Sequence, residues 1–307
     1  MRSGILLLDK PRGLSSNAAL QRVRRLLGGI KAGHAGSLDP LATGMLPICL
    51  GEATKIAADI ISARKRYRFT IALGVRTTTG DAEGEVAATA AVPAVELRQV
   101  ETLLAGLLGA SAQVPPMYSA LKRGGEPLYR LARAGLEVER APRVIELYEL
   151  PVLALADGRL ELEALCSKGT YIRVLAEDIA ARLGTCGHVA ELRRVYVEPF
   201  EHEPMVTLEA LASRPVAADW PPLLAVDYPL KHLPAVQLRA GEAARLLRGQ
   251  AIAGSAPPGE RQSGAGAAVR VRLYDEVGTF LGIGAEDGSG AVRPRRLLNF
   301  GTPAAPQ

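Results

Sequence analysis

The chain has 307 residues, of which 48% are hydrophobic, and its 37 basic residues outnumber the 32 acidic ones. This length and apolar content predict a folded protein with a sizeable core, and the sequence pI near 9.2 suits a polyanionic partner. Three scattered cysteines without a CxxC pair exclude a disulfide scaffold, and the short apolar runs exclude a signal peptide and a membrane span, so we expect a cytoplasmic protein.

The first half of the chain alternates apolar runs, which predict strands, with amphipathic stretches, which predict helices. Ser15, Ser16 and Asn17 are candidate N-caps, and apolar residues three or four apart follow them as far as Gly28. In chain order, the expected elements are a strand at 5–8, a helix from the N-cap to about 27, a strand at 45–50, a helix at 52–61, a strand at 66–73 and a helix at 96–108.

The second half continues this irregular mixture. We expect a pair of strands at 144–156 and 160–166 that turns near Asp157 and Gly158, then a helix at 171–183 and a strand at 188–197. Because strands and helices interleave without a regular alternation, the sequence predicts an α+β fold with a central mixed, largely antiparallel sheet flanked by helices.

A change of composition marks a domain boundary. Five prolines and the only tryptophan fall between Arg214 and Pro234, which predicts one domain over 1–230 and a small β-rich domain over 231–307. In the second domain we expect a helix at 240–247, a flexible segment at 254–268, and strands at 269–274 and 280–285.

The loop at 33–47 has the most unusual composition. It holds one acid, Asp39, among three glycines and two prolines, five residues after His34. Pro40 biases Asp39 toward an extended backbone, and glycine allows the backbone to approach a ligand closely. An acid in such a rigid loop can be aimed at a substrate, although Asp, Gly and Pro are also ordinary turn residues.

This loop resembles the catalytic loop of the bacterial tRNA pseudouridine-55 synthases, in which the aspartate of Gly-His-x-Gly-x-Leu-Asp-Pro-x-Ala-x-Gly is the essential acid. The resemblance implies that Asp39 is catalytic and that the chain has the pseudouridine synthase fold. It extends over residues 4–197 and, more weakly, over the tail, which resembles the PUA RNA-binding domain. The implied reaction breaks the N1–C1′ bond of uridine 55 in the T-loop of tRNA, turns the base over and joins C5 to C1′.

A second segment, Cys166–Ala176, resembles the family motif whose arginine pairs with the catalytic aspartate, which implies that Arg173 is that partner. The residues alone also allow an exposed Arg173 that pairs with Glu177 one helical turn further on. Whether Asp39 attacks C1′, attacks C6 or removes a sugar proton stays open. In each case the carboxyl group must be ionised, and burial and an arginine partner shift its pKa in opposite directions.

Four further residues match the family's uridine pocket. The resemblance implies that Tyr67 stacks on the uracil and helps to deprotonate C5, and that His34 props the loop open near the flipped nucleotide. It implies a polar contact for Tyr171 and an apolar wall for Leu192. Without the resemblance, Tyr67 and Leu192 equally fit the core side of a strand.

A segment at about 113–140 resembles the mobile RNA-binding insertion that closes over the T-loop in this family. Its Gly124-Gly125 pair favours flexibility, and Lys122 and Arg123 supply positive charge. Other cations form a candidate phosphate footprint: Arg22, Arg24, Arg25, Lys31, Arg64, Lys65, Arg66, Arg130, Arg133, Arg193, Arg194, Arg293, Arg295 and Arg296.

The resemblance thus implies an isomerase that acts on tRNA, needs no metal or other cofactor, and works as a monomer without a protein partner or a membrane. Two alternatives stay open: an RNA-binding protein that folds tRNA without chemistry, and a pseudouridine synthase that depends on a guide RNA. The assignment to position 55 rests on the resemblance alone.

Overall fold

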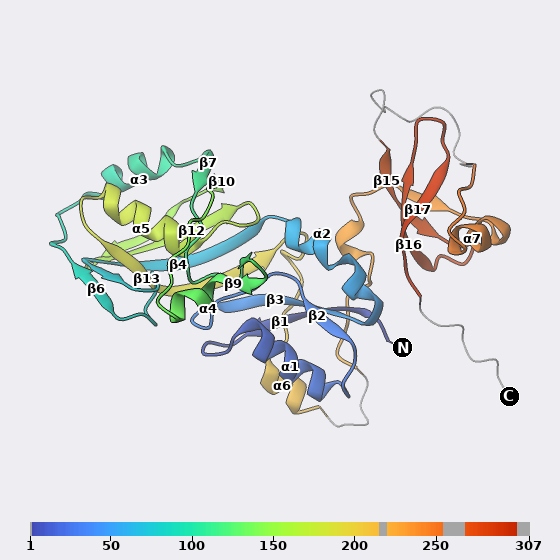
Figure 1. Cartoon of the computed structure of the whole chain (residues 1–307), viewed down its shortest axis with the longest axis horizontal. Coiled ribbons are helices and arrows are strands. Elements are labelled where there is room, and N and C mark those ends of the chain that lie inside the picture. The colour runs from blue at the N-terminus through green and yellow to red at the C-terminus, as the bar shows by residue number, and fades with distance from the viewer. Residues whose placement is uncertain (1, 215–219, 254–267, 300–307) are drawn as a thin grey trace.

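The computed structural model describes residues 2–214, 220–253 and 268–299, and two β-sheets organise most of this part of the chain (Figure 1). The larger sheet has nine strands and the C-terminal one has four. The architecture is therefore α+β, as predicted. The flexible segment expected at 254–268 lies outside the described residues, apart from its last position.

In the larger sheet the main path runs β1-β3-β13-β4-β12-β10-β7, while β2 pairs with β3 and β11 pairs with β12. Only the β13–β3 pair is parallel, so the sheet is mixed and largely antiparallel. The strands are β1 (Gly4–Lys10), β2 (Ala32–His34), β3 (Thr43–Leu50), β4 (Lys65–Leu73), β7 (Gly109–Gln113), β10 (Arg143–Glu149), β11 (Val152–Ala156), β12 (Arg159–Cys166) and β13 (Gly187–Val197).

Side chains alternate between the two faces of this sheet, and each face has its own apolar cluster. Leu6 and Leu8 belong to the cluster on one face, whereas Ile5 and Leu7 belong to the cluster on the other. The first face is covered by α1 (Ser16–Leu26), α3 (Leu97–Ala105), α5 (Ile172–Arg182) and α6 (Leu208–Ala212). The second face is covered by η1 (Gly51–Ile56), α2 (Ala57–Ser62) and η2 (Tyr228–Leu230).

The C-terminal part forms a small sheet with the order β14-β15-β16-β17 and one helix, α7. Phe280 and Ile283 of this sheet join the apolar cluster on the second face of the large sheet. The elements are β14 (Ala235–Gln237), α7 (Ala240–Leu247), β15 (Val269–Tyr274), β16 (Phe280–Glu286) and β17 (Val292–Leu297). The division of the chain near residue 230 stays a prediction, because this cluster crosses it.

Two expected elements differ from the structure. The single strand expected at 144–156 is two strands, β10 and β11, interrupted at Leu150 and Pro151, because proline has no N–H to continue the ladder. The helix expected at 52–61 begins as the 3₁₀ turn η1 before α2 continues it. The sequence does not predict four of the short strands: β2, β7, and the paired strands β5 (Val75–Thr77) and β6 (Val86–Thr89).

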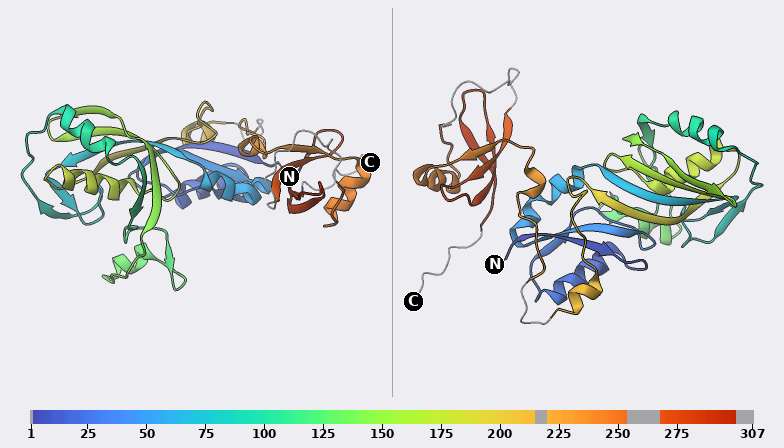
Figure 2. Two further views of the ribbon diagram at one scale, coloured as in Figure 1. Left: turned by 90° about the horizontal axis from the view of Figure 1, so that it is seen from above. Right: turned by 180° about the vertical axis from the view of Figure 1, so that it is seen from behind.

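The chain between β7 and β10 forms an insertion that projects from the body of the molecule (Figure 2, left). It carries the two-residue strands β8 (Lys122–Arg123) and β9 (Glu126–Pro127) and the helix α4 (Leu128–Arg133). Its position in the chain agrees with the insertion expected at about 113–140.

Candidate active site

The loop that carries Asp39 lies between β2 and β3 and is fastened from several sides. The Ser16 hydroxyl accepts a hydrogen bond from the Leu38 N–H (2.7 Å) and donates one to the Leu38 carbonyl (3.0 Å). The Lys10 ammonium donates to the carbonyls of Leu14 (2.7 Å) and Pro40 (3.4 Å). Asp39 is therefore held between two anchored neighbours.

Arg194 on β13 is the third anchor of this loop, and this corrects its expected place in the phosphate footprint. Only 1% of the residue is exposed, and its guanidinium donates to the carbonyls of Gly36 (3.1 Å), Ser37 (3.4 Å) and Met45 (2.7 Å). The β13–β3 crossing is so close here that a Cβ on Gly44 would collide with the Arg194 backbone. The glycine is thus required where the loop enters β3.

Arg173, in the first turn of α5, forms the ion pair with Asp39 that the second motif predicts. Its Nε lies 2.9 Å from Asp39 Oδ2 and its Nη2 lies 3.3 Å from Asp39 Oδ1, which is a two-pronged contact. The residue is 4% exposed, and its remaining donors bind the carbonyls of Thr79 (2.8 Å) and Tyr118 (2.7 Å). The alternative of an exposed Arg173 is wrong.

A second acid contacts the same guanidinium and was missed by the sequence analysis. Asp81 Oδ2 lies 3.7 Å from Arg173 Nε, and the Asp81 side chain is only 6% exposed. Its other oxygen accepts hydrogen bonds from the Thr79 hydroxyl (2.6 Å) and the Glu83 N–H (3.1 Å). The segment around it has the composition of a plain turn, so no sequence signal separates Asp81 from an ordinary turn aspartate.

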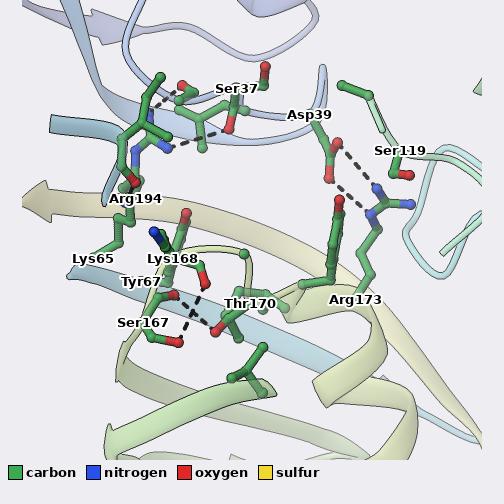
Figure 3. A pocket seen from close by; sticks show the side chains of 18 of the residues that line it. Ser37, Asp39, Lys65, Tyr67, Ser119, Ser167, Lys168, Thr170, Arg173 and Arg194 are labelled. Carbon is green, nitrogen blue, oxygen red and sulfur yellow. Dashed lines mark hydrogen bonds and ion pairs between the residues drawn. The ribbon is translucent and has the colours of Figure 1, made fainter. Parts of the chain in front are cut away.

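Two pockets meet at Asp39 (Figure 3 shows the first). Pocket A has a volume of about 480 Å³ and pocket B about 670 Å³. The residues that line both are Ser37, Leu38, Asp39, Ser119, Ala120 and Arg173. The Asp39–Arg173 pair therefore stands where one hollow passes into the other.

The expected site residues divide between these pockets. Tyr67, Tyr171 and Leu192 line pocket A together with Asp39 and Arg173, whereas His34 lines only pocket B. Lys122 and Arg123 lie on β8 in the insertion, exposed, and line neither pocket. The geometry thus brings together all the predicted site residues except the two basic ones on the insertion.

Pocket A combines an apolar wall with two titratable side chains, Tyr67 and Lys65, whose pKa values are shifted by burial. Leu192, 8% exposed, pairs across the ladder with Phe69, and next to it Tyr67 pairs with Arg194. Burial raises the pKa of the Tyr67 phenol, and the Arg194 charge opposes that rise. Lys65 also lines this pocket, where it is 6% exposed and its ammonium donates to the carbonyls of Ile61 and Ala63, so it is not part of a phosphate footprint. Burial lowers its pKa to about 8.

Competing charges act on the Asp39 carboxyl. About 38% of its side chain is still accessible, but the pocket walls remove enough water to raise its pKa above the ordinary value. The Arg173 charge acts in the opposite direction, the Asp81 charge raises the pKa further, and Lys10 lowers it. The site thus contains a carboxylate that is poorly solvated but paired.

Other expected phosphate contacts are paired within the protein. The Arg66 guanidinium binds Glu149 (2.6 Å) and Glu163 (2.7 Å), and Arg193 binds Asp9 (2.9 Å). Such pairs satisfy the charge inside the protein, so these arginines are weak candidates for RNA contacts. Within 2–214, 220–253 and 268–299, no group of three or more His, Cys, Asp or Glu residues is placed to hold a metal ion.

The site thus places a carboxylate paired with an arginine beside a pocket that a tyrosine and a leucine of the mixed sheet line. The fold and the site together define a pseudouridine synthase, an isomerase. The profile of the TruB family pseudouridylate synthase N-terminal domain matches residues 24–172. Profiles of the tRNA pseudouridylate synthase B C-terminal domain and of the pseudouridine synthase II TruB C-terminal region match residues 173–219 and 234–298. The chain belongs to the TruB family.

Full-length relatives agree with this membership. The chain is 49% identical over 296 residues to a tRNA pseudouridine synthase B of Aromatoleum aromaticum, covering 96% of this chain and 92% of the relative. It is 50% identical over 300 residues to a tRNA pseudouridine synthase B of Stutzerimonas stutzeri, covering 96% and 95%. The solved Cbf5-Nop10-Gar1 complex contains a chain with the same fold, with a TM-score of 0.68 and 22% identity over 96% of this chain and 84% of that one.

Proposed function

We propose that this protein converts uridine 55 in the T-loop of tRNA to pseudouridine. The observation that carries the proposal is the Asp39–Arg173 pair, which lines pocket A together with Tyr67 and Leu192. Relatives that are about half identical over nearly the whole chain are named tRNA pseudouridine synthase B, which supports tRNA as the substrate.

The residues fit the steps of this reaction. A uridine in a folded loop must first leave its stack, at a cost of a few kcal/mol, before a side chain reaches its glycosidic bond. Pocket A then receives the base between Tyr67 and Leu192, and the Asp39 carboxylate acts on the sugar–base junction. Arg173 keeps that carboxylate ionised and directed.

Tyr67 acts first as a stacking surface for the uracil. Because burial raises its pKa, the phenol is neutral at neutral pH, and a neutral phenol is a poor base. Its hydroxyl is thus better suited to guide the proton that leaves C5 than to capture it unaided. His34 is half-buried, and its Nδ1 atom has no hydrogen-bond partner within the described part of the chain. It lines pocket B, where a nucleotide next to the target would lie.

RNA docking is assigned to two further regions. The insertion at about 113–140 presents Lys122 and Arg123 to solvent, and the β-rich domain over 231–307 is a PUA-like RNA-binding module. We further propose that the enzyme works in the cytoplasm as a monomer and without a protein partner. No helix among the described residues is long and apolar enough to cross a membrane.

The decisive experiment is incubation of the purified protein with an unmodified tRNA transcript, followed by mapping of pseudouridine at nucleotide resolution. We expect one product, at position 55. The Asp39→Asn variant should bind the transcript with unchanged affinity and form no product, because the amide cannot act as a carboxylate. Product formed equally by this variant would contradict the assigned role. A wild type that refolds tRNA but forms no product would favour the RNA-folding alternative.

A further inference from the structure

The side chain of Ser119 is buried without a partner. The residue follows β7 in the insertion and is 6% exposed, and its Oγ atom makes no hydrogen bond with any described residue. Its backbone is already satisfied, because its N–H donates to the Met117 carbonyl (2.9 Å) and its carbonyl accepts from the Tyr129 N–H (3.1 Å). A buried hydroxyl without a partner costs stability, so the fold itself gives no reason for serine at this position.

Ser119 lies where the two pockets meet. It lines pocket A and pocket B, as Asp39 does. Arg173 Nη2 contacts both Asp39 Oδ1 (3.3 Å) and the carbonyl of Tyr118 (2.7 Å), so one nitrogen fixes the residue before Ser119 relative to the carboxylate. Figure 3 shows Ser119 beside the Arg173 guanidinium, with Asp39 across from it.

The phenol of Tyr171 is also near this hydroxyl. Burial raises the pKa of Tyr171, and the Ser119 hydroxyl opposes that rise, yet the two groups do not reach hydrogen-bond geometry. The Ser119 hydroxyl is therefore free to donate to, or accept from, a group that enters the junction of the two pockets.

The residues around the junction of the two pockets indicate which part of a nucleotide lies next to Ser119. In the proposed function the uracil enters pocket A, which Tyr67 and Leu192 line. A phosphate is disfavoured at the junction, because three acids, Asp39, Asp81 and Glu83, line pocket B and repel negative charge. Of the two arginines in that pocket, Arg173 is already paired with Asp39 and Arg133 is exposed. The ribose remains, and within an RNA chain its only free hydroxyl is the 2′-OH, attached to the carbon next to C1′, where Asp39 must act.

We propose that the Ser119 hydroxyl hydrogen-bonds the 2′-OH of the target uridine and makes the enzyme prefer uridine to 2′-deoxyuridine. The contact positions the ribose against Asp39 and reads the group that distinguishes RNA from DNA. This inference rests on the proposed function, since it assigns the sugar subsite of the same reaction.

The test compares two tRNA substrates that differ only in the 2′-OH of the target nucleotide. Single-turnover rate and tRNA affinity are measured for the wild type and for Ser119→Ala. The wild type should lose about three- to tenfold on the deoxy substrate, the range expected for one neutral hydrogen bond. Ser119→Ala should lose the same factor on the ribose substrate and nothing more on the deoxy one.

An equal preference for the ribose substrate in both enzymes would overturn the contact. If the wild type does not turn over the deoxy substrate, the affinities of the two enzymes for the two substrates are compared instead. An equal preference for the ribose substrate in both enzymes would again overturn the contact. Ser119→Thr, which keeps the hydroxyl, should restore the preference. Ser111→Ala, at an exposed position of β7 outside both pockets, should leave it unchanged.

Ser119→Ala should not lower the melting temperature, since the hydroxyl has no hydrogen-bond partner among the described residues. A wild type that forms no pseudouridine on the ribose substrate contradicts the proposed function. The affinities of the wild type and Ser119→Ala for the two substrates still test the contact between Ser119 and the 2′-OH.

Discussion

Arg173 is the residue on which the geometry of the site depends. Its guanidinium is almost fully buried and makes four hydrogen bonds, two to Asp39 and one each to the carbonyls of Thr79 and Tyr118. A buried cation is stable only when it is paired and its donors are satisfied. The pairing is shared, because Asp81 approaches the same Nε from another side. Arg173 therefore joins the loop that carries Asp39, the Thr79 turn and the insertion.

Asp81 should act on the reaction through Arg173, because its buried carboxylate approaches that guanidinium. We expect Asp81→Asn to lower the single-turnover rate at saturating tRNA by about tenfold or more, because a small misplacement of the Asp39–Arg173 pair is costly. Affinity for tRNA should stay unchanged. Asp178→Asn, the same substitution at an exposed position on α5, is the matched control. An unaltered rate in Asp81→Asn would mean that Thr79 and Tyr118 suffice to hold the arginine.

The raised pKa of Asp39 predicts the pH dependence of the rate. The role proposed for Asp39 requires its ionised form, so the rate should fall as pH decreases through the pKa of this carboxyl. Because burial raises that pKa, the midpoint should lie above the value of about 3.9 for a free aspartate. Single-turnover rates between pH 4 and pH 8, with tRNA binding followed in parallel, measure it. A rate that stays flat down to pH 4 would show that Arg173 outweighs burial.

At the scale of elements, the sequence predicts what local patterning determines and misses what depends on distant partners. The strand at 66–73 and the helix at 171–183 appear almost as expected, because their apolar residues repeat with the period of the element. The short strands β2 and β7 carry no such repeat and form only because longer strands lie beside them. Arg194 resembles a surface arginine in the sequence, since the three carbonyls that bury it are about 150 residues away.

The insertion between β7 and β10 should act on RNA binding and not on the chemical step. Lys122 on β8 is exposed and lines neither pocket. We expect Lys122→Ala to weaken tRNA binding by about threefold and to reduce the slope of log affinity against log salt by about one, with the rate at saturation unchanged. Arg98→Ala removes an exposed cation on α3, outside both regions assigned to RNA docking, and serves as the control. An unchanged salt slope would place Lys122 outside the RNA footprint.

At the scale of the molecule, the small C-terminal sheet lies at one end of the long axis and the insertion projects from the other half (Figures 1 and 2). The small sheet is firmly attached. Arg270 pairs with Asp59 of α2 at 2.7 Å, and the Lys55 ammonium donates to the Leu297 carbonyl at 2.9 Å. Phe280 of β16 enters the apolar cluster that also contains Ile5 of β1. The two parts therefore share a core.

A shared core predicts that the two parts unfold together. Phe280 is 8% exposed, and Phe280→Ala should lower the free energy of unfolding by about 3–5 kcal/mol through lost burial and a cavity. Trp220, the only tryptophan, packs against the cluster on the far face of the large sheet, so its fluorescence reports on the catalytic part. In denaturant titrations, fluorescence and circular dichroism should give the same unfolding midpoint, and Phe280→Ala should lower both midpoints by the same amount.

Val277→Ala, at a position that is 87% exposed, is the control and should leave that midpoint unchanged. If the Trp220 midpoint in Phe280→Ala equals that of the wild type, the small sheet unfolds on its own and the cluster does not couple the two parts.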